Sequence, residues 1–271
     1  ITMTHSILEP NALAIRTKFG TVFHTGDWKI DPEPLLGDTT NEAMLKRIGD
    51  EGALAMVCDS TNVFVEGEAG SEATVRAHLE KLVHGRKGRV AVTCFASNLA
   101  RVESVALAAV AVGRHPVLAG RALQRMVESA QECGYLLDFP ECVPEQQAGF
   151  LPRDKVLFIC TGSQGESRAT MAKLANNEHR DLVLEQGDTA IFSSRVIPGN
   201  ERSVGRLQNA LMAHGVEVIT DREADIHVSG HPARDELVRV YQWVRPKIAL
   251  PVHGEVRHML EHAALARACQ V

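Results

Sequence analysis

Two short polar motifs near the end of the chain hold the histidines best placed to do chemistry. The sequences HVSGH at 227–231 and PVHGE at 251–255 each end a short apolar run, 224–228 and 248–252. Between them, residues 233–244 carry apolar side chains at helical spacing. The pattern predicts a strand, a helix and a second strand, with histidines at the strand ends. Imidazole is both a metal ligand and a proton carrier near neutral pH, so metal binding or acid–base catalysis is expected there.

A second group of candidates combines residues of the first half of the chain with His253. His5 stands in an opening loop, and Asp27 follows an apolar alternation at residues 21–25. Either residue alone is more often a structural loop group than a ligand. Imidazoles and a carboxylate are ligands that zinc accepts, and a carboxylate can bridge two ions. His5, Asp27 and His253 are therefore predicted metal ligands, although three side chains are too few for two ions.

Asp59 and His231 form a separate candidate pair. Asp59 ends an apolar run at residues 53–58 and opens the sequence DSTN, whose ordinary interpretation is a turn closed by its own side chains. The sharper interpretation pairs Asp59 with His231, since a carboxylate orients an imidazole and keeps it protonated for use as a general acid. The sequence leaves both interpretations open.

Three turns in the middle of the chain are rich in small hydrogen-bond donors. They occupy residues 95–98, 161–166 and 198–200, and each precedes a predicted helix whose free N–H groups suit either a phosphate or a simple cap. The chain has neither a Walker A sequence nor a GxGxxG run, which disfavours a nucleotide cofactor. Seven arginines of this region fit polyanion binding and helix solubilisation equally well. They are Arg86, Arg101, Arg121, Arg125, Arg195, Arg202 and Arg206.

Two further histidines are predicted to be ordinary surface groups. His258 and His262 stand four residues apart on a terminal helix and share a face at that spacing. Because Glu255 and Glu261 lie beside them, a solvated surface is expected rather than a metal site.

Composition indicates a globular protein without a generally cationic surface. Of 271 residues, 45% are hydrophobic, and 29 basic against 34 acidic side chains give a net charge of -5. A local basic groove is compatible with this balance. The six cysteines show no CxxC spacing and are interpreted as reduced, which favours the cytoplasm. No apolar run approaches the roughly 18 residues that a membrane span needs.

The middle of the chain alternates helix and strand regularly. Helices are expected at 71–84, 98–112, 121–133, 166–176 and 200–214, and strands at 89–94, 115–119, 155–160 and 189–193. Such alternation implies right-handed crossovers and a parallel sheet covered on both faces. We therefore expect an α/β protein in which a Rossmann-like domain, residues 72–225, is inserted into a domain formed by 1–71 and 226–271.

Eight short motifs follow one another along the chain. They are THS (4–6), HTGD (24–27), CDSTN (58–62), FASN (95–98), TGSQGE (161–166), IPGNE (197–201), HVSGH (227–231) and PVHGE (251–255). In this order they resemble ribonuclease J, a β-CASP family of the metallo-β-lactamase superfamily. The resemblance runs from residue 4 to the C-terminus, and eight ordered motifs make it specific.

The resemblance implies a role for each matching residue. His5 is similar to the family's third metal-binding motif, Asp27 to the fourth, whose carboxylate bridges two zinc ions, and His253 to a ligand of the second zinc. Asp59 and His231 resemble the two motifs beside the scissile phosphate and are the implied catalytic residues. The segments similar to those that contact RNA phosphate contain Ser97, Asn98, His227, Ser229, Gly230 and His231.

The resemblance also implies a fold that agrees with the segmentation. It is an αββα metallo-β-lactamase domain, with its first part at 1–71 and its return segment at 226–271, interrupted by a β-CASP domain at 72–225. The family's HxHxDH motif, which contributes most zinc ligands, does not occur in these 271 residues. That motif is expected upstream of Ile1, and the family's C-terminal domain beyond Val271, so the metallo-β-lactamase fold is expected to be partial.

The implied activity is zinc-dependent hydrolysis of RNA phosphodiester bonds, with two zinc ions in a complete active site. It combines 5'-to-3' exonuclease and endonuclease action in RNA processing and mRNA decay. Expected partners are RNA, especially 5'-monophosphate ends, and further copies of the full-length protein in a homodimer or homotetramer, with no membrane. Two alternatives are a non-nuclease hydrolase of the same superfamily and an inactive fragment that serves only as an RNA-binding or interaction module.

Overall fold

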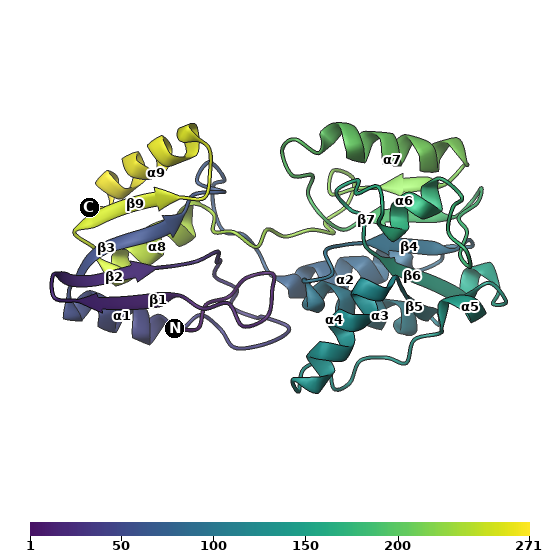
Figure 1. Cartoon of the computed structure of the whole chain (residues 1–271), viewed down its shortest axis with the longest axis horizontal. Coiled ribbons are helices and arrows are strands. Elements are labelled where there is room, and N and C mark those ends of the chain that lie inside the picture. The colour runs from purple at the N-terminus through teal and green to yellow at the C-terminus, as the bar shows by residue number, and fades with distance from the viewer. The chain divides into compact units, whose positions relative to one another are not determined.

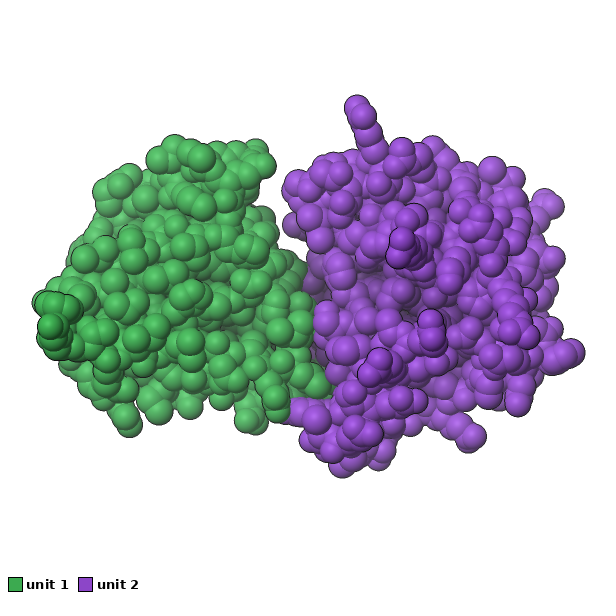
Figure 2. All heavy atoms as spheres, in the orientation of Figure 1, with its two compact units in different colours: residues 1–71, 229–271 green, residues 72–228 purple.

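The computed structural model describes all 271 residues, which divide into two compact units. Unit 1 comprises Ile1–Ser71 and Ser229–Val271, and unit 2 comprises Glu72–Val228 (Figure 2). The chain therefore enters unit 2 once and leaves it once, as an inserted domain does. The second crossing, between Val228 and Ser229, lies slightly beyond the predicted division at 225/226.

Unit 1 is built on a four-stranded mixed sheet in the order β1-β2-β3-β9 (Figure 1). Its strands are β1 (Leu13–Thr17), β2 (Gly20–His24), β3 (Ala53–Asp59) and β9 (Ile248–Val252), and its helices are α1 (Glu42–Glu51), α8 (Arg234–Val244) and α9 (Val256–Ala268). The first two strands are antiparallel and are joined by a turn at residues 18–19. β3 runs parallel to both β2 and β9, so these three strands end at the same edge of the sheet.

The core of unit 1 lies on one face of this sheet. Helix α8 contributes Leu237, Val240, Tyr241 and Val244, all of which are buried, in agreement with their helical spacing. On the opposite face, alternate strand residues remain exposed, since Leu13 is 58% and Leu250 45% accessible. The sheet of unit 1 thus buries one apolar face and leaves part of the other open to solvent.

Unit 2 contains a five-stranded, entirely parallel sheet in the order β5-β6-β4-β7-β8. Its strands are β4 (Val90–Thr93), β5 (His115–Ala119), β6 (Val156–Cys160), β7 (Thr189–Phe192) and β8 (Glu217–Ile219). Its helices are α2 (Glu72–Val83), α3 (Leu99–Ala111), α4 (Arg121–Glu132), α5 (Glu145–Ala148), α6 (Thr170–Ala175) and α7 (Glu201–Ala213), with a 3-10 turn at Arg153–Lys155. The parallel sheet and its helices confirm the predicted α/β class. No helix of the chain combines the length and apolar character that crossing a bilayer requires.

Three local predictions are wrong. Residues 224–228 form a loop rather than a strand, because the carbonyl of Ile226 accepts its hydrogen bonds from the side chains of Arg101 and Ser193 and not from a neighbouring strand. The predicted helix at 166–176 begins only at Thr170, since turns occupy the residues before it. Strand β8 was not predicted because it has three residues, of which only Ile219 is buried.

Candidate metal centre and phosphate-binding loops

Four of the predicted functional side chains converge in unit 1. Asp27, Asp59, His231 and His253 each offer one ligand atom, and these atoms all lie within 4.8 Å of one another. Asp59 is the last residue of β3 and His253 directly follows β9, its parallel neighbour, so the sheet brings the two together. Asp27 and His231 approach from loops. Two carboxylates and two imidazoles at this spacing are a donor set that fits zinc.

Asp59 orients His231 directly. Its Oδ2 lies 2.6 Å from His231 Nδ1, while its Oδ1 accepts the backbone N–H of Thr61 at 2.8 Å and the Thr61 hydroxyl at 2.7 Å. The carboxylate therefore closes a local turn with one oxygen and holds the imidazole with the other. The turn and the pair, which the sequence offers as alternatives, coexist.

The same pair has opposite effects on the two ionisation equilibria. Burial opposes charge on Asp59, but the hydrogen bonds from His231 and Thr61 hold the pKa of its carboxyl below the usual value. Burial acts to lower the pKa of His231, but the hydrogen bond and the negative charge of Asp59 outweigh it and raise that pKa. The pair is thus stabilised as carboxylate and imidazolium.

Asp27 and His253 form the more accessible side of the group. Their side chains are 48% and 52% exposed, and Asp27 Oδ2 lies 3.6 Å from His253 Nε2. The backbone of His253 has a positive φ of 57°, which is unfavourable for a residue with a side chain. Hydrogen bonds from Ser60 N to the Val252 carbonyl, at 2.9 Å, and from the Thr61 hydroxyl to the His253 carbonyl, at 3.2 Å, hold this turn in place.

His5 lies beside this group but is not one of its four members. Its ring centroid is 5.2 Å from that of His231, and its Nδ1 makes a hydrogen bond to the Gly230 carbonyl. Burial lowers the pKa of His5, which favours the neutral imidazole that a metal requires. A Cβ on Gly230 would lie 2.6 Å from Ser6 Oγ and 2.7 Å from His5 Cε1. The close approach of His5 therefore depends on glycine at position 230.

Replacing Gly230 with alanine is expected to displace His5 and to lower the free energy of unfolding by about 1–3 kcal/mol, because the added methyl overpacks the loop. Denaturant unfolding measures this change. Gly205, in α7, has open space around its Cβ position, so Gly205→Ala is a matched control that should raise stability instead. Equal unfolding free energies for Gly230→Ala and the unmodified protein would contradict the packing assigned to His5.

His262 is buried, which corrects the predicted solvated surface. The residue lies on α9 and is 0% exposed, with Nδ1 2.8 Å from the Ser60 hydroxyl and Nε2 2.9 Å from the Tyr241 hydroxyl. Its neighbour His258 remains partly accessible. Burial lowers the pKa of His262 to about 4, so this histidine is a neutral core group that links α8, α9 and the end of β3.

The buried His262 makes stability depend on pH. Its pKa is about 4 in the folded state and about 6.5 in the unfolded chain, so the unfolded state takes up the proton first as the pH falls. This contribution is fully present above pH 6.5 and should shrink by about 2 kcal/mol between pH 7 and pH 5. Urea unfolding at both pH values tests it: His262→Gln should reduce the difference, whereas His84→Gln, at an exposed position, should not. An unchanged difference in His262→Gln would contradict the assignment.

The predicted phosphate-binding residues are divided between the units. Ser97, Asn98 and His227 belong to unit 2, and Ser229, Gly230 and His231 belong to unit 1. Asn98 is largely committed to the fold, because its Oδ1 caps α3 through the Arg101 N–H and its Nδ2 donates to Glu72 Oε1, both at 3.0 Å. Ser97 instead lines an open pocket of about 660 Å³.

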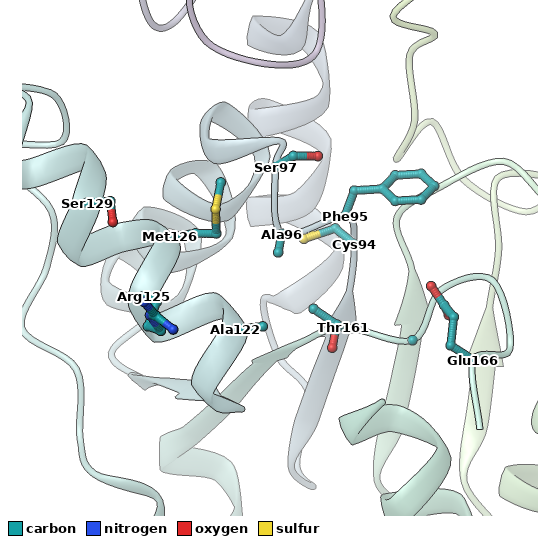
Figure 3. Close-up of a pocket in the computed structure, with 11 residues that line it drawn as sticks. Cys94, Phe95, Ala96, Ser97, Ala122, Arg125, Met126, Ser129, Thr161 and Glu166 are labelled. Carbon is teal, nitrogen blue, oxygen red and sulfur yellow. The ribbon is translucent and has the colours of Figure 1, made fainter. Parts of the chain in front are cut away.

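That pocket lies where the loops after β4 and β6 leave neighbouring parallel strands (Figure 3). The pocket opens at the carboxyl ends of these two parallel strands, the edge of an α/β sheet at which ligands commonly bind. Its lining also includes Arg125 and Ser129 from α4 and Thr161 and Glu166 from the second loop. Among the seven arginines left open by the sequence, Arg125 therefore has access to an anion.

Arg101 has neither of the two predicted arginine roles. Its guanidinium is 1% exposed and makes two hydrogen bonds to Glu72, from Nε to Oε2 and from Nη2 to Oε1, each at 2.8 Å. Nη1 donates to the carbonyls of Ser193 and Ile226 at 2.8 and 3.0 Å. Arg101 is thus a buried anchor that joins the first and last segments of unit 2.

Comparisons with known proteins agree with this geometry. The family model described as "Ribonuclease J, beta-CASP domain" matches residues 87–211, and the one described as "Zn-dependent metallo-hydrolase RNA specificity domain" matches 215–269. Fold, site and these matches define a β-CASP protein of the metallo-hydrolase class, for which the second description implies a metal cofactor. The group of four side chains is a possible site for that metal.

Individual relatives place the chain in a narrower group. It is 51% identical to a ribonuclease J of Sinorhizobium meliloti over 263 residues, which cover 97% of this chain and 47% of that protein. It is 43% identical to a ribonuclease J of Mycolicibacterium smegmatis over 270 residues, covering 99% of the chain and 48% of that protein. The chain belongs to the ribonuclease J family and spans about half the length of these curated relatives.

A solved structure supports the fold alone. A protein of unknown function from Enterococcus faecalis V583 superposes with a TM-score of 0.62 at 16% identity. The match covers 97% of this chain and 58% of that protein, so both units take part in the likeness. At this identity it carries no information on activity.

Proposed function

We propose that this chain supplies part of a two-zinc active site at which RNA phosphodiester bonds are hydrolysed. The observation that carries the proposal is the convergence of Asp27, Asp59, His231 and His253 within 4.8 Å. Membership of the ribonuclease J family supports RNA as the substrate. The activities proposed for the whole protein are 5'-to-3' exonuclease and endonuclease action, in RNA processing and mRNA decay.

The residues of unit 1 fit the metal. Zinc would be held by Asp27 and His253, and His5, held neutral by burial, would add a second imidazole donor. When bound, zinc supplies a nucleophile at neutral pH and stabilises charge on the attacked phosphate. These donors also come from different elements, a loop, a strand end and an opening segment, so binding would tie them together.

His231 is the proposed general acid. Its Nδ1 is hydrogen-bonded to Asp59 at 2.6 Å, so Nε2 is the nitrogen that would deliver a proton to the departing 3'-oxygen. Cleavage in this sense gives a product that carries a 5'-phosphate. The raised pKa of His231 favours the protonated form that this step needs. Asp59 acts on the reaction only through His231.

The proposed RNA contacts are made by small donors. Ser97, Asn98, His227, Ser229, Gly230 and His231 are assigned to phosphate binding on their motifs. Arg125 beside Ser97 adds a positive charge to the pocket of unit 2. RNA with a 5'-monophosphate is the proposed partner, the whole protein is proposed to form a homodimer or homotetramer, and its proposed location is the cytoplasm.

Cleavage of RNA tests the proposal. Uniformly labelled RNA with a 5'-monophosphate is incubated with the protein and zinc, and the products are separated by size and analysed for their termini. Release of mononucleotides from the 5' end, each with a 5'-phosphate, is the expected result. Products with 2',3'-cyclic phosphates, or intact RNA in the presence of fully metal-loaded protein, would overturn it.

A further inference from the structure

Glu236 occupies an unusual position in unit 1. It stands in the first turn of α8 and is 0% exposed, and its carboxylate accepts three backbone N–H groups. Oε1 accepts from Ile30 at 2.6 Å, and Oε2 accepts from Ala69 at 2.9 Å and Ala233 at 2.7 Å. Only the bond to Ala233 is explained by capping of α8, since a capping glutamate reaches back three residues.

The three donors belong to three different segments, and two of these carry candidate functional residues. Ile30 follows Asp27 by three residues, and Ala233 follows His231 by two. Ala69 lies two residues before Ser71, where the first part of unit 1 ends. One buried carboxylate therefore joins the Asp27 loop to the His231 loop.

A second buried charge strengthens this connection. Lys29 is 1% exposed, and its Nζ lies 3.0 Å from Asp31 Oδ2 and 2.8 Å from the Gly70 carbonyl. The Thr4 hydroxyl donates to the Lys29 carbonyl at 2.7 Å and accepts the Asp31 N–H at 3.0 Å, which attaches the segment of His5. The segment after Asp27 is thus joined to residues 69–70 twice, by the anion of Glu236 and by the cation of Lys29, whereas the His231 loop is reached by Glu236.

We propose that Glu236 is a positioning residue that fixes the Asp27 loop relative to the His231 loop in the candidate metal centre. It acts through the backbone that carries the functional side chains, a role comparable to that of the outer partners that orient metal ligands in other sites. The inference rests on the proposed function in one respect only, that Asp27 and His231 are taken as the functional groups.

Replacing Glu236 with glutamine is expected to weaken the three hydrogen bonds unequally. Glu236→Gln keeps the shape of the side chain but offers one acceptor oxygen, and the amide NH2 then faces an N–H donor. An oxygen at the Oε2 position retains the bonds to Ala69 and Ala233, so the bond to Ile30 is the one lost. The Asp27 loop should be released while the His231 loop stays in place. Glu236→Ala should release both.

Amide hydrogen exchange and backbone NMR shifts of the metal-free chain read out this effect. In Glu236→Gln, exchange at Ile30 should accelerate by about 10-fold or more, with Ala69 and Ala233 changed less, and the Asp27 resonance should shift or broaden. Val240→Ala is a matched control, because this buried residue of the same helix packs in the core and its apolar side chain offers no hydrogen-bond acceptor to the three donors. It should lower stability and leave the Asp27 and His231 resonances in place.

Two outcomes would overturn the inference. In the first, Glu236→Gln and Glu236→Ala leave the Asp27 and His231 resonances at their original positions. In the second, Val240→Ala displaces them as much as Glu236→Ala does, which would indicate general loosening. If Glu236→Ala does not fold, the comparison of Glu236→Gln with Val240→Ala is sufficient.

Zinc titration then separates this inference from the proposed function. The affinity for zinc should fall about 10- to 100-fold in Glu236→Gln and remain unchanged in Val240→Ala. Unchanged affinity in Glu236→Gln would overturn the positioning role for metal binding. If the unmodified protein binds no zinc while the NMR shifts behave as expected, the metal centre is wrong and the positioning of the two loops stands.

Discussion

Replacing Asp27 with alanine is expected to remove bound zinc from the protein and to lower RNA cleavage by about 100-fold or more. The side chain is 48% exposed and lies 3.6 Å from His253, so the fold does not depend on it as it does on a buried ion pair. Removing the carboxylate should leave the unfolding free energy within about 0.5 kcal/mol of its original value. The loss would therefore report on metal binding and not on folding.

Elemental analysis of the purified variant, together with the cleavage rate, measures this effect. Asp38→Ala is a suitable control, because Asp38 is an exposed aspartate of the loop that follows Asp27. That variant should keep both metal and activity. If Asp27→Ala retains the zinc content of the unmodified protein, Asp27 is not a ligand and its proposed role in the metal centre must be abandoned.

Replacing His231 with alanine is expected to lower turnover by about 10²- to 10⁴-fold while zinc content stays unchanged, since proton transfer from a positioned side chain contributes about that much. The hydrogen bond of 2.6 Å to Asp59 holds Nδ1, and the pKa of the imidazole is raised by that partner. Both features favour a proton donor over a metal ligand, which must be unprotonated at the binding nitrogen.

Asp59→Asn sharpens this experiment. Loss of the negative charge should lower the pKa of His231, so the protonated acid is lost at a lower pH and the alkaline limb of the turnover profile moves to lower pH. Zinc content in both variants is measured alongside. A parallel loss of zinc and turnover in His231→Ala would identify His231 as a ligand instead, a result that its place among the four converging side chains allows.

Much of the fold can be predicted from the sequence because local patterns determine it. Strands β4 and β6 are buried along their whole length and are apolar in sequence apart from Thr93, and the regular spacing of Leu237 to Val244 marks α8. The loop at 224–228 is different. Its apolar residues suggest a strand, but Arg101, more than a hundred residues earlier in the chain, supplies the hydrogen bond that its backbone needs.

The residue types of the site can be predicted from the sequence, but their arrangement in space cannot. Carboxylates and histidines at strand ends indicate a metal or acid–base centre, yet the sequence separates them into a metal set and a catalytic pair. Only the parallel pairing of β3 with β9 shows that Asp59 and His253 end side by side. Burial of His262 depends on packing between α9 and α8; the sequence signal for it is that Leu265 and Ala266, three and four residues later, share its buried face.

The role of Glu236 has only a weak signal in the sequence. A glutamate at the third position of a helix is half of a known capping pattern, and the other half, a serine or threonine at the N-cap, is replaced by Ala233. Its bonds to Ile30 and Ala69 join residues more than 160 positions apart, and these require the folded chain.

The central claim is that Asp27 and His253 bind a metal beside the Asp59–His231 pair. Crystals of the protein grown with zinc, measured on both sides of the zinc absorption edge, test it most directly. The account predicts an anomalous difference peak about 2 Å from ligand atoms of Asp27 and His253, the distance typical of zinc–oxygen and zinc–nitrogen bonds. A zinc peak elsewhere in the chain, with none at these residues, would contradict it.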